Sequence, residues 1–382
     1  MRRVGITGAG GLLGWHLRAR LHALRSAVIV PIHTPAFHDE AILRELVSSC
    51  DVLVHLACKI TGEGEEILRE NQRIDERLTS ALDAAGRPIP LVHASSTHVE
   101  RPTPYGEAKR RSEAHLSRWA EARGAPKTSI LFPNIFGEGG RPFHNSVVAT
   151  FCHQVARGLE PTIFTDADLT LVHAQDAAAE IIEAIVAIEA GGHGERRPGG
   201  ARMRVSEILA AIRVIDREYR AGGVVPDLRD SFQRSLFNTY RSHLFPDFYP
   251  TRLELREDAR GALFEAVKTL HGGQAFLSTT RPGITRGNHF HLRKLERFCV
   301  VKGTAIIRIR RLFSDKIHAF EVSGDTPVVI DIPTLHTHSI QNTQSTSGEE
   351  LLTLFWSSEI YNPADPDTYA EPVQPEPTAK PQ

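Results

Sequence analysis

The feature that most constrains the fold of this chain is a glycine-rich turn near its N-terminus. Gly8, Gly11 and Gly14 follow a short apolar stretch at residues 4–7 and lead into a stretch with helical periodicity at residues 12–26. In a strand–turn–helix unit, the first glycine permits a tight turn, the second lets the backbone approach a pyrophosphate, and the third allows close packing of helix on strand. The pyrophosphate binds the unpaired N–H groups at the helix N-terminus. The turn therefore predicts a dinucleotide-binding domain.

The residues after the turn extend this prediction. Short apolar stretches alternate with longer stretches of helical periodicity. Strands separated by helices form βαβ units, so we expect an α/β domain of Rossmann type with a parallel sheet. The predicted strands are residues 4–7, 27–32, 51–56, 90–94 and 128–132.

Near residue 245 the pattern changes to short runs rich in β-branched residues, separated by Gly, Asn and Asp. Such runs are typical of an all-β barrel or sandwich. Two prolines just before these runs suit a linker, and the end of the chain is rich in Pro, Glu and Thr. We predict a dinucleotide-binding domain at 1–245, a linker at 246–250, an all-β domain at 251–372 and a disordered tail at 373–382.

Charge and composition exclude several functions. Lys and Arg number 45 and Asp and Glu 46, a net charge of −1, which gives no electrostatic footprint for nucleic acid or an anionic membrane. No apolar run approaches the ~18 residues of a spanning helix, and an apolar-glycine pattern begins at Val4, which leaves no room for a signal peptide. Four scattered cysteines suggest reduced thiols. We therefore expect a cytoplasmic protein that binds neither nucleic acid nor membrane.

The end of the second predicted strand bears on the choice of cofactor. An Asp or Glu at this position would bind the ribose 2′-OH of NAD and repel the 2′-phosphate of NADPH. The strand ends with Ile32, His33 and Thr34, without an acid, which favours NADPH. His33 itself is either a cofactor contact or a solvated loop residue.

Tyr105 and Lys109 are spaced i, i+4 and would share one face of a helix. An ammonium group close to a tyrosine hydroxyl favours the phenolate and lowers the tyrosine pKa, which makes the tyrosine a usable acid or base near neutral pH. Ser95 and Ser96 stand upstream at the end of a predicted strand, where a hydroxyl could bind the same substrate oxygen.

These elements resemble the extended short-chain dehydrogenase/reductase family over residues 1–245. The resemblance implies a catalytic triad of Ser96, Tyr105 and Lys109, with Ser95 as second choice. Thr97-His98 stands where the sugar-nucleotide dehydratases of that family have Asp-Glu, which argues against a 4,6-dehydratase. The implied cofactor contacts are Gly8, Gly11, Leu12, Leu13, Gly14, His33, Ala57, Tyr105 and Lys109. The implied substrate contacts are Asn134 and Asn145.

A histidine cluster in the β-rich part predicts a metal site. His289 and His291 alternate on one strand and so point to the same face, and Glu296 follows after a turn. A later segment supplies a fourth ligand from His336 or His338. Three imidazoles and one carboxylate suit Zn²⁺, and also Fe, Mn or Ni.

This cluster resembles the cupin family, whose two sequence motifs are both present. The resemblance implies an all-β cupin barrel and assigns the fourth metal ligand to His338, with Leu335 in place of a motif glycine. His336 is then either an alternative ligand or a catalytic base that lines the pocket. A divalent ion, most simply Zn²⁺, is expected once per chain.

The two resemblances together match a family of bifunctional capsular-polysaccharide enzymes. That match implies epimerisation at C3 of a UDP-2-acetamido-2,6-dideoxy-4-ketohexose in the cupin, followed by NADPH-dependent reduction of the C4 ketone to the L-talo product. In that family the product leads toward N-acetyl-L-fucosamine in surface polysaccharide. The match also implies a homodimer. Two alternatives stay open: a 4-epimerase with tightly bound NAD and an accessory cupin, and a non-catalytic regulator that binds dinucleotide and sugar.

Overall fold

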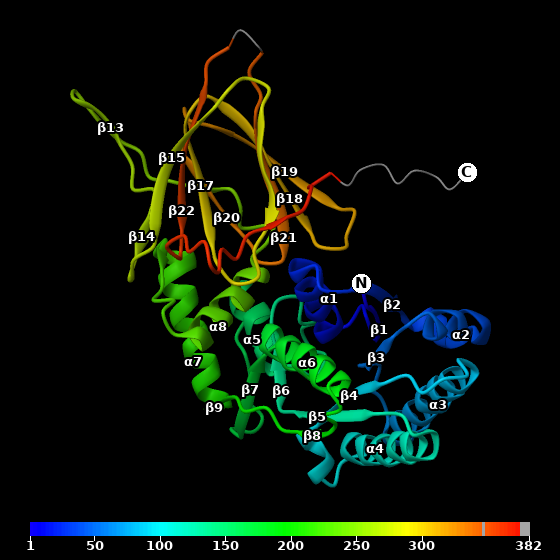
Figure 1. Ribbon diagram of the computed structural model, residues 1–382. Coiled ribbons are helices and arrows are strands. Elements are labelled where there is room, and N and C mark those ends of the chain that lie inside the picture. The colour runs from blue at the N-terminus through cyan, green and yellow to red at the C-terminus, as the bar shows by residue number, and fades with distance from the viewer. Residues whose placement is uncertain (346–347, 375–382) are drawn as a thin grey trace. The chain divides into compact units, whose positions relative to one another are not determined.

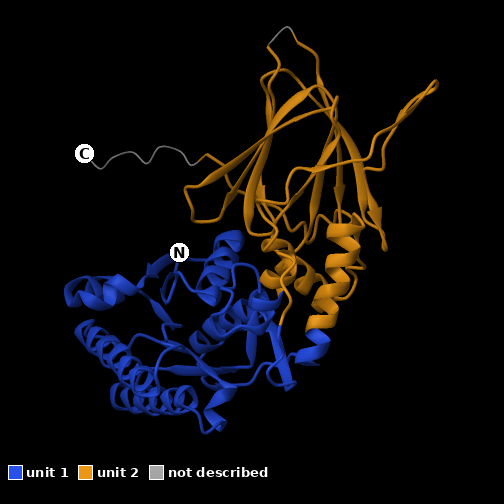
Figure 2. Ribbon diagram, turned by 180° about the vertical axis from the view of Figure 1, so that it is seen from behind, with its two compact units in different colours: residues 1–151, 162–208 blue, residues 152–161, 209–382 orange. Residues whose placement is uncertain are grey.

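The computed structural model describes residues 1–345 and 348–374. The chain divides into two compact units, coloured separately in Figure 2. Unit 1 comprises residues 1–151 and 162–208, and unit 2 comprises residues 152–161 and 209–382. The domain division at residue 245 rests on sequence pattern and stays a prediction.

Unit 1 is built on a six-stranded sheet in the order β2-β1-β3-β4-β5-β8 (Figure 1). All five strand pairings are parallel, as the alternation of strands and helices predicts. The strands are β1 (Arg3–Thr7), β2 (Val28–Ile32), β3 (Val52–His55), β4 (Leu91–Ser96), β5 (Lys127–Phe132) and β8 (Gly194–Arg196). A second sheet holds β6 (Asn134–Phe136), β7 (Asp168–His173) and β9 (Ala201–Arg204).

Helices cover both faces of the six-stranded sheet. In β3, Val54 packs with residues of α1 and α6, whereas the adjacent Leu53 packs with residues of α2, α3 and α4. Successive side chains of a strand point to opposite faces, so a strand covered on both sides is apolar throughout. The helices that pack on these faces are α1 (Leu12–Leu24), α2 (Glu40–Ser48), α3 (Gly64–Ala84), α4 (Pro104–Arg123) and α6 (Ala174–Glu189), with 3₁₀ turns η1 (Thr34–His38) and η2 (Thr97–Glu100). The chain passes from one unit to the other within α5 (Val147–Ala156) and α7 (Val205–Ile215). The Rossmann-like arrangement is confirmed.

Unit 2 contains two five-stranded sheets, in the orders β11-β20-β17-β22-β15 and β19-β18-β21-β16-β23 (Figure 1). The first sheet holds β11 (Thr251–Arg252), β15 (Gln274–Thr280), β17 (Glu296–Lys302), β20 (Val328–Ile332) and β22 (Leu351–Ser357). The second holds β16 (Thr285–Phe290), β18 (Thr304–Arg311), β19 (Ile317–Ser323), β21 (His336–Asn342) and β23 (Tyr369–Ala370). Shorter elements are the π-helix η3 (Asp216–Ala221), helix α8 (Ser231–Ser242), and strands β10 (Val224–Val225), β12 (Arg256–Asp258), β13 (Gly261–Leu263) and β14 (Lys268–Thr269).

The two large sheets share one apolar core. Phe298 and Ile330 of the first sheet pack with Ile307 and Ile340 of the second. Within the described residues, hydrogen bonds do not join the sheets into a closed ring of strands. The structure therefore shows a sheet-rich domain, and the closed barrel expected from the sequence is not confirmed.

Both ends of the predicted β domain are held by hydrogen bonds. In the predicted linker, Tyr249 is buried, and its hydroxyl lies 2.6 Å from the hydroxyl of Tyr219. At the predicted start of the tail, Val373 is buried, donates its N–H to Asn288 and accepts at its carbonyl from Arg310. Residues 375–382 of the predicted disordered tail lie outside the described residues.

No helix among the described residues is long and apolar enough to cross a membrane.

Candidate functional site

The glycine turn of unit 1 has the geometry that a pyrophosphate requires. Gly8 has φ +66°, and a Cβ atom there would lie 2.9 Å from the backbone nitrogen of Ala57. A Cβ at Gly14 would lie 2.3 Å from the Gly8 carbonyl oxygen, so only glycine permits this approach. Gly11 caps α1 without a side-chain hydrogen bond, which leaves the first N–H groups of the helix to a ligand. The turn therefore fits a dinucleotide.

A buried chain of hydrogen bonds holds the turn in place, and sequence reasoning missed it. The Thr7 hydroxyl accepts from the N–H groups of Leu56 (3.0 Å) and Ala57 (3.1 Å), so its own proton is left for Nδ1 of His55, 2.8 Å away. The other ring nitrogen of His55 lies 3.1 Å from a carboxylate oxygen of Asp75 on α3. In the sequence, the signal is that Thr7 and His55 are polar residues at the ends of two apolar strands; Asp75 stands out from nothing, because α3 is polar along most of its length.

Helix α4 presents Tyr105 and Lys109. Thr103 caps the helix by accepting from the N–H of Gly106, which places Tyr105 in the first turn and Lys109 one turn later. The Lys109 ammonium is buried, donates to the Ala94 carbonyl oxygen at 2.9 Å and lies 5.9 Å from the centre of the Tyr105 ring. The fold therefore brings the two predicted residues together at the carboxyl end of β4.

The electrostatics of this pair differ in one respect from the expectation. Burial raises the pKa of Tyr105, and the opposing effect of the Lys109 charge does not offset it. Burial alone would lower the pKa of Lys109, but the neighbouring Cys58, Tyr105 and Asp75 together hold it above its ordinary value. Lys109 therefore stays protonated and Tyr105 keeps its proton at neutral pH.

The two candidate serines have different surroundings. Ser96 Oγ accepts from the N–H of His98 at 3.2 Å, and a hydrogen bond from Ser96 lowers the pKa of Tyr105. Ser95 Oγ is buried and has no hydrogen-bond partner among the described residues. The geometry thus groups Ser96, rather than Ser95, with Tyr105.

The candidate substrate residues lie on β6 and just before α5. Asn134 donates its side-chain amide to the Thr170 carbonyl at 3.1 Å and so helps to join β6 to β7. Asn145 is exposed and has φ +55°. Binding of a sugar nucleotide by these two residues stays a prediction.

Four side chains in unit 2 form a candidate metal centre. His289, His291, Glu296 and His338 each offer a ligand atom, and these atoms lie within 4.8 Å of one another. One oxygen of Glu296 lies 3.1 Å from Nε2 of His291, 3.3 Å from that of His338 and 3.5 Å from that of His289. His289 and His338 are opposite one another on β16 and β21. The sheet register therefore assembles the predicted set.

The hydrogen bonding of this cluster fits a metal ion. Nε2 of His289 and of His291 are buried and lack a hydrogen bond of good geometry. Nδ1 of His291 lies 2.6 Å from the Asp367 carbonyl oxygen, a contact typical of ligating histidines because it fixes the ring with Nε2 toward the metal. Despite burial, the three imidazoles hold the pKa of Glu296 well below its usual range, and burial lowers the pKa of His338 to about 4. An anionic carboxylate and neutral imidazoles are the ligand forms of these groups.

His336 lies apart from the four ligands. Its Nδ1 is 2.8 Å from the Thr334 carbonyl oxygen, and its ring lies 5.2 Å from that of Phe245. In the described part of the chain, the metal-ligand group includes His338 and not His336.

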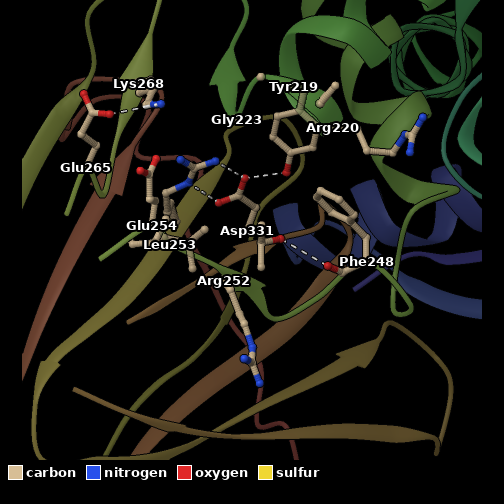
Figure 3. Close-up of a pocket in the computed structure, with 15 residues that line it drawn as sticks. Tyr219, Arg220, Gly223, Phe248, Arg252, Leu253, Glu254, Glu265, Lys268 and Asp331 are labelled. Carbon is tan, nitrogen blue, oxygen red and sulfur yellow. Dashed lines mark hydrogen bonds and ion pairs between the residues drawn. The ribbon is translucent and has the colours of Figure 1, made fainter. Parts of the chain in front are cut away.

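A cavity of about 350 Å³ in unit 2 shares no residue with the metal centre. Figure 3 shows its wall around Asp331, which Arg297 binds through two hydrogen bonds of 2.6 and 2.8 Å. Tyr219 donates its hydroxyl to the same carboxylate at 2.6 Å. Arg297 and Asp331 are almost fully buried, so this network is part of the internal packing of unit 2.

Comparison with known proteins identifies the family. The sequence model of the NAD dependent epimerase/dehydratase family matches residues 4–197, which is 194 of the 382 residues. The chain belongs to this family. A second model, the polysaccharide biosynthesis C-terminal domain, matches residues 256–369. These ranges correspond to the glycine turn with its parallel sheet and to the two sheets of unit 2.

Two known proteins are similar to this chain over nearly its whole length, and a third shares the fold of part of it. A Pseudomonas aeruginosa protein named UDP-2-acetamido-2,6-beta-L-arabino-hexul-4-ose reductase is 30% identical over 370 residues, 96% of this chain and 98% of that protein. The capsular polysaccharide assembling protein CapF of Staphylococcus aureus is 32% identical, with a TM-score of 0.62 over 97% of this chain and 100% of its own. The UDP-glucose 4-epimerase of Thermus thermophilus shares the fold over 64% of this chain and 99% of its own, at 18% identity and a TM-score of 0.53.

Proposed function

We propose that this chain is a bifunctional nucleotide-sugar enzyme of capsular polysaccharide biosynthesis. Its C-terminal domain, a cupin, epimerises C3 of a UDP-2-acetamido-2,6-dideoxy-4-ketohexose, and its N-terminal domain then reduces the C4 ketone with NADPH to the L-talo product. The observation that carries this proposal is the similarity, over 96% of the chain, to a protein named as a reductase of a UDP-hexul-4-ose. The paired resemblance to CapF supports it.

The geometry of unit 1 supports the reduction step. NADPH, when bound at the glycine turn, supplies a hydride to C4. Tyr105 keeps its proton at neutral pH because burial raises its pKa, so it can donate that proton to the C4 oxygen as negative charge develops there. Lys109 stabilises the phenolate that remains, and Ser96 orients the oxygen beside Tyr105. Asn134 and Asn145 are proposed to contact the sugar nucleotide.

The chemistry of the substrate supports epimerisation before reduction. A ketone at C4 acidifies the proton on C3, so that proton can be exchanged only until the ketone is reduced. His289, His291, Glu296 and His338 would hold one divalent ion, proposed to be Zn²⁺, which would polarise the ketone as a Lewis acid or stabilise the fold. His336 is the proposed base, because it is a buried imidazole on the same strand as the ligand His338.

We also propose a cytoplasmic homodimer that associates through unit 2. The edge strand β15 exposes 42% of Phe276 and 64% of Leu277. Exposed apolar side chains on an unpaired strand edge favour pairing with another chain. The mass of the particle in solution, measured by light scattering, tests this part of the proposal.

One experiment separates the two reactions. The full chain is incubated with the UDP-4-keto sugar in D₂O, first without and then with NADPH. We expect deuterium at C3 before NADPH is added, and consumption of one NADPH per sugar afterwards. His289→Ala should lose the exchange, whereas Tyr105→Phe should keep it and lose the reduction. If the chain instead interconverts the C4 epimers of a UDP-sugar that carries a C4 hydroxyl, with no net consumption of NADPH, it is a 4-epimerase with tightly bound NAD.

A further inference from the structure

A guanidinium and an imidazole, those of Arg18 and His33, lie beside residues 9 and 10 of the glycine turn. Arg18 projects from the second turn of α1, and its Nη1 donates to the carbonyl oxygen of Ala9 at 3.3 Å. On the side of β2, Nδ1 of His33 lies 3.4 Å from the position that a Cβ at Gly10 would occupy. Ala9 and Gly10 are consecutive residues of the turn, so Arg18 and His33 reach neighbouring positions of it, close to the end of β2.

Arg18 supplies the permanent charge at this place. Burial lowers the pKa of His33, and the charge of Arg18 lowers it further, so His33 is neutral at pH 7 and acts there as a hydrogen-bonding group. Burial also lowers the pKa of Arg18, but a guanidinium stays ionised at any physiological pH. A half-buried cation of this kind favours an anion beside it.

The acid that would read a ribose hydroxyl is absent from this position. Residues 32–36 contain none, and the next acid along the chain is Asp39. Asp39 Oδ1 accepts from the N–H groups of Ala41 and Ile42 and so caps α2. The end of β2 therefore presents cationic and neutral groups, and the carboxylate that follows next along the chain, that of Asp39, caps α2.

We propose that Arg18, assisted by His33, binds the 2′-phosphate of NADPH and thereby selects NADPH over NADH. In this fold the adenosine ribose lies beyond the end of the second strand, next to the part of the turn that Arg18 and His33 reach. The planar guanidinium matches two phosphate oxygens at once, and such charge-assisted pairs are strong. The proposal rests on the dinucleotide site of the proposed function and names the residue that gives this site its specificity.

The test is dinucleotide affinity of the full chain, measured by calorimetry with NADPH and with NADH. Arg18→Met keeps the length and apolar stem of the side chain and removes the charge. We expect it to weaken NADPH binding by roughly 10- to 100-fold and NADH binding by less than about twofold. Arg20→Met is the matched control, since it makes the same change two residues further along α1, and it should leave both affinities unchanged. His33→Asn should weaken NADPH alone, by a smaller factor.

The NADH affinity in the same samples shows whether each variant is folded. If Arg18→Met does not bind NADH, Arg18→Lys, which keeps the charge but not the planar fork, should give an intermediate loss for NADPH. Competition by 2′-AMP against 5′-AMP isolates the phosphate, and wild type should prefer 2′-AMP. The proposal is overturned if Arg18→Met retains the preference for NADPH, or if wild type binds both dinucleotides equally. A wild type that prefers NADPH but does not reduce the keto sugar would overturn the reaction and leave this inference standing.

Discussion

Replacing Lys109 with methionine would remove a charge without emptying the space that it fills. The ammonium lies 5.9 Å from the centre of the Tyr105 ring, and the site is buried. At an effective dielectric constant of about 20, unit charges at this separation interact by about 3 kcal/mol. That corresponds to about two pKa units of Tyr105, or about a hundredfold in the rate of a step that leaves a phenolate behind.

The assay is the loss of NADPH absorbance with the UDP-4-keto sugar, at saturating NADPH. Saturation is needed because Lys109 is also a predicted cofactor contact, and weaker binding would otherwise add to the loss. We expect kcat to fall about a hundredfold in Lys109→Met and by roughly 10²–10⁴ in Tyr105→Phe, the usual range for a general acid. Lys302→Met, at an exposed lysine of β17, is the control, and its kcat should equal that of wild type.

The double variant decides whether Lys109 acts through Tyr105. Without the tyrosine hydroxyl there is no phenolate for the ammonium to stabilise, so Lys109→Met should cost little more in a Tyr105→Phe background. If instead the two losses multiply, Lys109 acts on the substrate or cofactor directly. A kcat close to that of wild type in Lys109→Met would refute the electrostatic argument altogether.

Three further variants test other parts of the structure. His338→Ala should lower bound zinc, measured by elemental analysis, from about one ion per chain, whereas His318→Ala outside the cluster should not; full occupancy in His338→Ala would exclude it as a ligand. Asp331→Asn leaves the buried Arg297 without its counter-charge and should lower the free energy of unfolding, measured in urea, by about 3–5 kcal/mol. Asp325→Asn, at an exposed carboxylate, should change it little. Arg297 holds the pKa of Asp331 below its ordinary value despite burial, so the stabilisation from this pair is present above about pH 4 and lost as the pH falls further. An equal fall in the free energy of unfolding in Asp331→Asn and Asp325→Asn at pH 7 would contradict this reasoning. Thr7→Val removes the acceptor for two N–H groups behind the turn and should weaken NADPH binding by roughly tenfold. Thr7→Ser keeps the hydroxyl and should bind NADPH as wild type does; an equal loss of affinity in Thr7→Ser would show that the methyl group, and not the hydroxyl, is needed.

The sequence allowed prediction of those parts of the fold that depend on local spacing. Glycines at 8, 11 and 14 indicated the turn because the backbone comes close to other backbone atoms there, most tightly at Gly8 and Gly14. The alternation of apolar and helical stretches indicated the parallel sheet because a sheet covered on both faces is apolar in every strand. The four candidate metal ligands could be named because His289 and His291 have the alternate spacing of one strand face, Glu296 follows after a turn, and the family motif assigned His338.

Features that depend on contacts between distant elements could not be predicted. The hydrogen bond between His55 and Asp75 joins strand β3 to the helix α3 that follows it, across 20 residues of sequence, and nothing in either local pattern indicates the other. The pKa of Tyr105 was expected to fall because Lys109 stands one helical turn away. It rises because the surrounding protein excludes water from the hydroxyl, and burial is a property of the packed structure. Closure of the β domain likewise depends on which strands pair at the edges of the sheets.

The protonation states of the two sites suit different steps of the proposed reaction. A proton donor to a forming alkoxide must hold its proton until the hydride arrives, and the raised pKa of Tyr105 meets that requirement. Removal of the C3 proton needs a base with a pKa nearer to neutral. Glu296 is a poor base, because the three imidazoles around it hold its pKa well below the usual range, and this low basicity suits a permanent ligand instead. Because Glu296 does not suit this role, our candidate for the C3 base is His336, and exchange of the C3 proton measured in His336→Gln, with bound metal determined in the same sample, would show whether it is the base.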